Sequence, residues 1–177
     1  MNKTLVLNAD YSPMQIVDWK RAVTLFVEGT VFITQPYLKD GKPVLIGTAS
    51  DYRIERPAII VAKKYVDMSK KRVKLSRVNL LYRDDFTCQY TGAKLPADEL
   101  DIDHVIPKSR GGKNTWENMV TCSKNLNNKK SDRTAEEMGY RLIAQPRRPH
   151  WSNLLMKKIK HDGPEIWVEF LKGMGYT

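Results

Sequence analysis

The chain has no long hydrophobic run and few cysteines. Its longest apolar runs, such as residues 58–62, are far shorter than the about 20 residues of a membrane-spanning helix. The opening MNKTLVLNADYS shows no apolar stretch followed by a small-residue cleavage site, so we expect no secretory signal. Two cysteines in 177 residues form no framework of pairs, which favours a reducing compartment. These absences predict an intracellular, cytoplasmic protein with no membrane partner.

The charge balance is strongly positive. The chain has 30 lysine and arginine residues against 20 aspartate and glutamate residues, a formal net charge of +10. Such an excess favours a polyanionic partner, nucleic acid first and an acidic membrane surface second. With 41% hydrophobic and 28% charged residues, the composition is that of a folded globular protein. Charge alone does not separate a binding protein from an enzyme.

Residues 1–66 are expected to form a small α+β part. The apolar run 5–7 is typical of a short strand. Asp18 can cap a helix whose apolar residues recur at helical spacing, and Gly29 can end that helix. Three further strands are expected between glycine and proline turns, at 31–33, 44–46 and 58–61.

Three further segments complete the predicted domain organisation. They are a basic linker over 67–80, a core over 81–140 and a C-terminal helical extension over 141–177. At the end of the core, the T-x-x-E pattern of Thr134 and Glu137 predicts the start of a helix. A last helix is expected from the proline at 164 to the glycine at 173.

Most of the chemistry-bearing side chains lie in residues 100–134, LDIDHVIPKSRGGKNTWENMVTCSKNLNNKKSDRT. Apolar and polar residues alternate at its start, a strand-like period that puts Asp103 and His104 on opposite faces. A proline and two glycines then allow a turn, and residues 119–121 can return as a second strand. Ser123 can cap a short helix after it. The segment therefore predicts a strand, loop, strand and helix.

The motifs D-H-V-I-P, W-E-N and N-x-x-K-x-D-R-T of this segment resemble the HNH endonucleases, whose core is the ββα-metal fold. The resemblance is densest over 83–137. The opening L-V-L-N-A-D-Y is also similar to the start of a bacterial and phage branch of these nucleases. The resemblance implies an α+β fold with a ββα-metal core, a small α+β N-terminal extension and a C-terminal helix.

The same resemblance implies a role for four residues in hydrolysing DNA phosphodiester bonds. Asp103 and Asn127 would ligate one divalent metal ion, Mg²⁺ or Mn²⁺. His104 would be the general base for the attacking water, and Asn118 would brace the loop that orients it. An imidazole, with an ordinary pKa of about 6.5, can accept a proton at cellular pH. A hard cation on carboxylate and amide oxygens offsets the charge that develops on the phosphate.

Basic residues around the motif are candidates for contacts with nucleic acid. Arg83 lies where the chain of the family enters the core, a position at which a basic residue can contact nucleic acid. The three basic linker residues at 70–72 either stay solvated or follow a phosphate backbone. Trp116 is expected to be a packing anchor rather than a base-stacking platform. The full set of expected nucleic-acid contacts is Arg83, Lys108, Arg110, Lys113, Lys129 and Lys130, with Lys70, Lys71 and Arg72 of the linker.

The chain departs from many relatives at their structural zinc site. Where those relatives carry two C-x-x-C pairs, this sequence has Cys88 with Thr91 and then Ser123 with Leu126, while Cys122 lies beside a lost position. A closed zinc site needs four good ligands, usually thiolate or imidazole. We therefore expect no structural zinc and no small-molecule cofactor.

Two other classes of function stay open at this point. The first is a nucleic-acid-binding protein that keeps the HNH fold without catalysis, and the second is a structural or interaction protein with a basic face. The sequence leaves open the DNA specificity, nicking against double-strand cleavage, the oligomeric state and the biological role.

Overall fold

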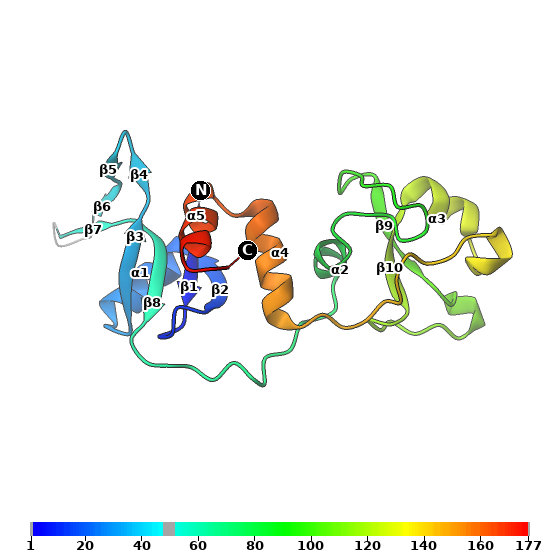
Figure 1. Cartoon of the computed structure of the whole chain (residues 1–177), viewed down its shortest axis with the longest axis horizontal. Coiled ribbons are helices and arrows are strands. Elements are labelled where there is room, and N and C mark those ends of the chain that lie inside the picture. The colour runs from blue at the N-terminus through cyan, green and yellow to red at the C-terminus, as the bar shows by residue number, and fades with distance from the viewer. Residues whose placement is uncertain (1, 48–51, 177) are drawn as a thin grey trace. The chain divides into compact units, whose positions relative to one another are not determined.

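The computed structural model describes residues 2–47 and 52–176 and confirms the α+β fold class. Contacts group the chain into two compact units (Figure 1). The first unit contains Met1–Lys71 and Lys158–Thr177, and the second contains Arg72–Lys157. None of the helices in the described segments combines the length and the apolar composition that a membrane span requires.

The first unit is built on a four-stranded sheet with two small two-stranded ladders. Asp40 and Gly41, both with positive φ, make the turn of one ladder. The strands are β1 (Lys3–Leu7), β2 (Pro13–Asp18), β3 (Val31–Pro36), β4 (Leu38–Lys39), β5 (Lys42–Pro43), β6 (Leu45–Gly47), β7 (Arg53–Glu55) and β8 (Pro57–Ala62).

The order of the large sheet is β2-β1-β8-β3. Strand β1 pairs antiparallel with β2 and parallel with β8, while β3 pairs antiparallel with β8. The two central strands are almost entirely buried, which explains why both read as apolar runs in the sequence.

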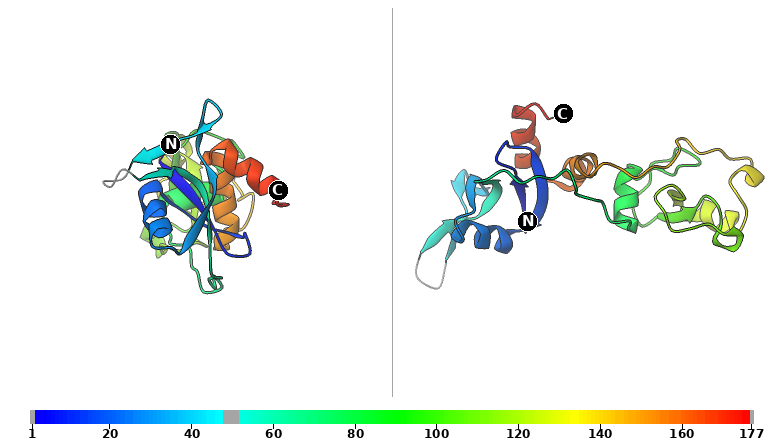
Figure 2. Two further views of the ribbon diagram at one scale, coloured as in Figure 1. Left: turned by 90° about the vertical axis from the view of Figure 1, so that its left-hand side faces the viewer. Right: turned by 90° about the horizontal axis from the view of Figure 1, so that it is seen from below.

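Helix α1 (Trp19–Val27) covers one face of this sheet. Asp18 caps it as predicted, because its carboxylate accepts a hydrogen bond from the Lys20 N–H at 2.9 Å. Ala22 of this helix packs with Val6 and Ile60 of the central strands. Figure 2 shows α1 (blue) and α5 (Glu165–Gly173, red) on opposite sides of the sheet.

The last helix, α5, is confirmed where the sequence predicts it, and it completes the core of the first unit. Trp167 is 1% exposed, and its indole Nε1 donates to the Ala58 carbonyl oxygen of β8 at 2.8 Å. Leu171, one turn later, is also buried. The C-terminal residues therefore cover a sheet formed by the N-terminal ones.

The second unit contains the predicted strand, loop, strand and helix. Ser123 caps the helix, since its hydroxyl accepts from the Leu126 N–H at 3.3 Å. A hydrophobic cluster that includes Leu81, Leu100 and Leu154 packs beneath the strands. The elements are α2 (Arg77–Arg83), β9 (Leu100–His104), β10 (Met119–Ser123), α3 (Lys124–Lys130) and the first part of α4 (Trp151–Asp162).

Several elements differ from the sequence prediction, and the short strands β4, β5 and β7 and helix α2 are among those that were not predicted. Strand β2 was not predicted; it begins at Pro13, which an edge strand tolerates because one side of it needs no ladder hydrogen bond. Helix α4 was not predicted either. The capping box of Thr134 and Glu137 does form, with bonds of 2.9 and 3.3 Å, but it starts only a 3₁₀ turn over Glu136–Met138. Gly139, with φ of 75°, ends that turn.

Replacing Trp167 with alanine tests the packing of α5 on the first unit. We predict that Trp167→Ala lowers the free energy of unfolding by about 3–5 kcal/mol, because it leaves a cavity and an unpaired carbonyl. Chemical denaturation measures this, with the exposed Val27→Ala as the control, expected within about 0.5 kcal/mol of the parent. Equal stability of the two variants would contradict the packing.

Candidate active site

The strand pair β9–β10 positions the motif residues. The strands are antiparallel, with His104 opposite Met119 and Asp103 opposite Val120. Strand β9 ends at His104, and the chain then forms the loop of residues 105–118. The adjacent side chains of Asp103 and His104 have separate partners, as side chains on opposite faces of a strand do.

Asn118 braces the loop that follows His104. Its Oδ1 accepts from the Ile106 N–H at 2.8 Å, and its Nδ2 donates to the carbonyl oxygens of Ile106 (3.1 Å) and Lys113 (3.0 Å). Asn118 is 8% exposed, so little water competes for these bonds. Gly112 is required beside it, because a Cβ there would overlap the Ile106 carbonyl oxygen and lie 2.9 Å from Asn118 Nδ2. One amide therefore fixes the path of the loop.

His104 lies half-buried at the end of β9, with its ring held by a neighbour on the loop. Its Nε2 is 2.7 Å from Asn114 Oδ1. Because an amide oxygen only accepts, the ring donates from Nε2 in this contact and keeps Nδ1 as its basic nitrogen. The motif predicted His104, but it gave no signal for Asn114, whose contact depends on the folded loop.

Asp103 is a buried carboxylate, 6% exposed, with a partner on each oxygen. The Tyr90 hydroxyl donates to Oδ2 at 2.6 Å, and the Lys130 ammonium donates to Oδ1 at 3.1 Å. Lys130 also donates to the His104 carbonyl oxygen at 3.0 Å. Burial, followed by the bond to Asp103, raises the pKa of Tyr90, which keeps this hydroxyl a donor. Sequence reasoning did not identify Tyr90.

Asn127 of α3 faces the same strand. Its Nδ2 donates to Asp101 Oδ2 at 3.3 Å. Asp101 lies two residues before Asp103, hence on the same face of β9. Arg77 Nη1 donates to Asp101 Oδ1 at 2.8 Å, which pairs this carboxylate as well. The structure thus brings the two predicted metal ligands to one strand face, with Asp101 between α3 and α2.

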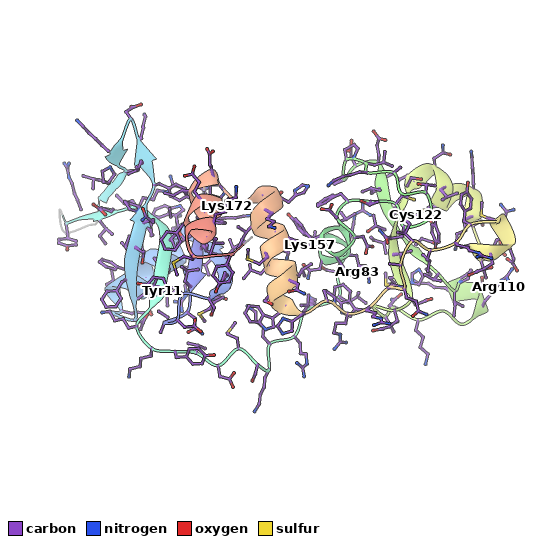
Figure 3. All side chains as sticks on the ribbon, in the orientation of Figure 1. Tyr11, Arg83, Arg110, Cys122, Lys157 and Lys172 are labelled. Atoms are coloured by element: carbon purple, nitrogen blue, oxygen red, sulfur yellow. The ribbon has the colours of Figure 1, made fainter. Side chains whose placement is uncertain are left out.

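Arg83 was expected to meet nucleic acid, but its side chain is only 9% exposed. Its Nε bonds to Asp84 at 2.7 Å, and its terminal nitrogens donate to the carbonyl oxygens of Trp116 and Met119, both at 2.7 Å. Trp116 is 2% exposed, which confirms it as a packing anchor. Figure 3 shows Arg83 near Lys157, whose ammonium donates to the Arg83 carbonyl oxygen at 2.6 Å. Arg83 therefore ties α2 to the start of β10.

Lys130 also differs from its prediction as a nucleic-acid contact. It is 1% exposed, because the ion pair with Asp103 holds its ammonium inside the second unit. Its helix neighbour Lys129 is exposed, and so are Lys108 and Lys113 on the loop. Arg110 (Figure 3) is also exposed, and its guanidinium pairs with Glu137 at 2.6 Å.

The basic linker residues have mixed surroundings. Lys70 and Arg72 are exposed, whereas the half-buried Lys71 donates from its ammonium to the Met14 carbonyl oxygen at 2.5 Å. Burial lowers the pKa of Lys71. Two of the three predicted contacts can therefore present their charge to solvent.

Cys88 and Cys122 lie together on the face of the strands that α3 covers. Both are free thiols with no exposed surface, and the hydrogen bond between them lowers the pKa of Cys88 and raises that of Cys122. Thr91 also bonds to Cys88. The two sulfurs belong to a hydrophobic cluster with Val120 and Leu126, so this region is packed by apolar side chains. Figure 3 labels Cys122 on β10.

Two family models match the chain. Residues 88–136 match the HNH endonuclease domain, and residues 4–70 match the HNH endonuclease-associated N-terminal domain. The chain belongs to the HNH endonuclease family. Membership assigns it a nuclease-type function with nucleic acid as the substrate class. Comparison with curated proteins gives no significant match.

The oxygen donors on β9 and α3 suit the hard divalent ion that HNH nucleases use. Asp103 keeps acceptor capacity beyond its two hydrogen bonds, and Asn127 donates through Nδ2, which leaves Oδ1 to coordinate. The described residues hold no cluster of three or more His, Cys, Asp and Glu that could bind a metal. A cation there would depend on water and phosphate for its other ligands, which Mg²⁺ accepts.

The brace at Asn118 gives a stability prediction for the site. We predict that Asn118→Ala lowers the free energy of unfolding by about 1–3 kcal/mol, because it leaves buried loop groups without partners. The exposed neighbour Glu117→Ala is the control, expected within about 0.5 kcal/mol of the parent. Thermal and chemical denaturation measure both, and an Asn118→Ala protein as stable as the control would show that the loop needs no brace.

Proposed function

We propose that the chain is a metal-dependent endonuclease that hydrolyses DNA phosphodiester bonds at the end of β9. The observation that carries the proposal is the adjacency of His104 and Asp103 on a strand end that Asn118 fixes. The first residue offers a basic nitrogen and the second a carboxylate on the opposite face. A nucleic-acid-binding protein without catalysis needs neither group in this arrangement.

His104 is proposed as the general base. Asn114 holds the proton on Nε2, so Nδ1 can take a proton from a water molecule as that water attacks phosphorus. The amide oxygen of Asn114 also remains bonded to the ring when the ring becomes positively charged. Asn118 acts indirectly on His104, because it fixes the loop that carries Asn114.

Asp103 and Asn127 are proposed as the protein ligands of one Mg²⁺ or Mn²⁺ ion. When bound, such an ion offsets the negative charge that develops on the phosphate and on the leaving oxygen. Tyr90 and Lys130 hold the Asp103 carboxylate in one orientation, and Asp101 does the same for the Asn127 amide. The exposed Lys108, Lys113 and Lys129 are placed to contact the DNA backbone.

Plasmid cleavage tests this function. We predict that the protein converts supercoiled plasmid to nicked or linear product with Mg²⁺ or Mn²⁺, and that His104→Ala slows cleavage by about 10²–10⁴. His104→Ala should keep DNA binding and thermal stability close to those of the parent. DNA binding without cleavage under any divalent ion would instead favour a non-catalytic binding protein.

Chelation separates the proposed catalytic ion from a structural one. We infer that the second unit holds no structural zinc, because apolar side chains surround Cys88 and Cys122. EDTA should therefore stop cleavage without lowering the melting temperature, and added Mg²⁺ should restore activity. One stoichiometric zinc in elemental analysis, with a large fall in melting temperature on its removal, would contradict this inference.

Salt dependence tests the proposed backbone contacts. Each phosphate contact contributes about −0.9 to the slope of log affinity against log salt. We predict that replacing Lys108 and Lys113 with alanine reduces the magnitude of the slope by about 1–2. Replacing Lys70 and Arg72 with alanine tests the linker in the same way, and the same reduction is expected where the linker follows the DNA backbone. Lys94→Ala is the control, because Lys94 already pairs with Asp85 at 2.9 Å. Unchanged slopes in these variants would show that the replaced residues are solvated and do not contact the DNA backbone.

A further inference from the structure

The two carboxylates on the proposed metal-binding face of β9 are each paired with a cation of the chain itself. Asp103 pairs with Lys130 at 3.1 Å, and Asp101 pairs with Arg77 at 2.8 Å. Asn127, the other proposed ligand, carries no charge. The groups that the described structure brings together here therefore sum to about zero charge, which is an unusual setting for a divalent cation.

Lys130 is the more consequential of the two cations, because its charge is fixed inside the second unit. The side chain is 1% exposed, and the ammonium donates both to Asp103 Oδ1 and to the His104 carbonyl oxygen. An ion coordinated by Asp103 would share that carboxylate with the ammonium. The two positive charges would stand within a few ångströms of each other, where water and salt screen them weakly.

A phosphodiester of the substrate changes this balance. Each phosphate brings one negative charge and oxygen donors, so an ion placed between Asp103 and a phosphate is held by two anions instead of one. The repulsion from Lys130 is then offset in the complex and not in the free protein. By linkage, whatever the phosphate adds to metal affinity, the metal adds to DNA affinity.

We propose that Lys130 keeps the metal affinity of the DNA-free protein low, so that the divalent ion and the DNA phosphate bind cooperatively. This rests on the proposed function, since it takes Asp103 as a metal ligand. Lys130 acts through Asp103 and is a positioning residue. The arrangement confines a loaded active site to the DNA-bound protein.

The first experiment measures Mn²⁺ binding to the DNA-free protein, from the electron paramagnetic resonance signal of unbound Mn²⁺. Lys130→Met keeps most of the length of the side chain without its charge, and Lys130→Arg keeps the charge. Lys124→Met removes the same charge from an exposed position on the same helix. We expect Lys130→Met to bind Mn²⁺ at least about tenfold more tightly than the parent, and the other two variants to stay within about threefold.

The second experiment measures the cooperativity directly in an otherwise native chain. Binding of a fluorescein-labelled DNA duplex is followed by anisotropy with and without Mn²⁺ at constant ionic strength, with His104→Ala to prevent cleavage. We expect Mn²⁺ to tighten DNA binding at least about tenfold. Adding Asp103→Ala should abolish this gain, and adding Lys130→Met should lower at least about tenfold the Mn²⁺ concentration at which half of the gain is reached.

Two results would overturn the proposal. One is a folded Lys130→Met protein, verified by its melting curve, that binds Mn²⁺ no more tightly than the parent. The other is a His104→Ala protein whose DNA affinity does not change when Mn²⁺ is added. This second result would overturn the proposal even if Lys130→Met fails to fold. Plasmid cleavage is a separate readout: cleavage without cooperativity removes this proposal alone, whereas no cleavage under any divalent ion removes the proposed function as well.

Discussion

A buried carboxylate must be compensated, and the second unit is organised around the compensation of Asp103. Leaving such a group unpaired costs several kcal/mol, about 3–5 when one partner of a buried pair is removed. Two elements of secondary structure and a loop meet this demand: β9 carries the carboxylate, α3 brings the Lys130 ammonium, and the loop after Cys88 brings the Tyr90 hydroxyl. Lys130 also donates to the His104 carbonyl oxygen, so the same ammonium holds the backbone of the proposed general base in position.

The rest of the second unit keeps this centre in place. Arg83 and Asp84 connect α2 to the strand pair: the guanidinium holds carbonyl oxygens at both ends of 116–119, and Asp84 accepts from the Thr121 N–H at 2.8 Å. On the other side of the strands, Cys88 and Cys122 pack in an apolar cluster. The first unit is a separate core, closed by Trp167, and its match to an HNH-associated domain links it to the same family.

Local signals in the sequence were sufficient for much of this arrangement. Alternation over β9, the turn residues after His104 and the cap at Ser123 each act on neighbouring residues, and each was confirmed. The capping box of Thr134 and Glu137 forms as predicted, but the prediction of a helix after it was wrong, because Gly139 ends the helical turn after three residues. Helix α4 carries buried Leu154, Leu155 and Ile159 at helical spacing, a signal that the arginine- and proline-rich segment before it obscured.

Charge was the weakest guide to the site. Arg83 and Lys130 look like neighbouring lysines and arginines in the sequence, but burial gives them structural partners, whereas Lys108 and Lys129 stay exposed. Which side of a helix or loop faces the interior is decided by tertiary packing, so no local pattern distinguishes them. The same holds for Tyr90 and Asn114, whose partners are 13 and 10 positions away along the chain.

The central claim is that the end of β9 forms a one-ion nuclease centre, and anomalous diffraction tests it most directly. Crystals of the His104→Ala protein with a DNA duplex and Mn²⁺ would be measured at the manganese absorption edge. The account predicts one ion bonded to an Asp103 oxygen and to Asn127 Oδ1, with a phosphate oxygen among its other ligands. An ion held elsewhere, at Cys88 and Cys122 or on exposed carboxylates with none at Asp103, would contradict it.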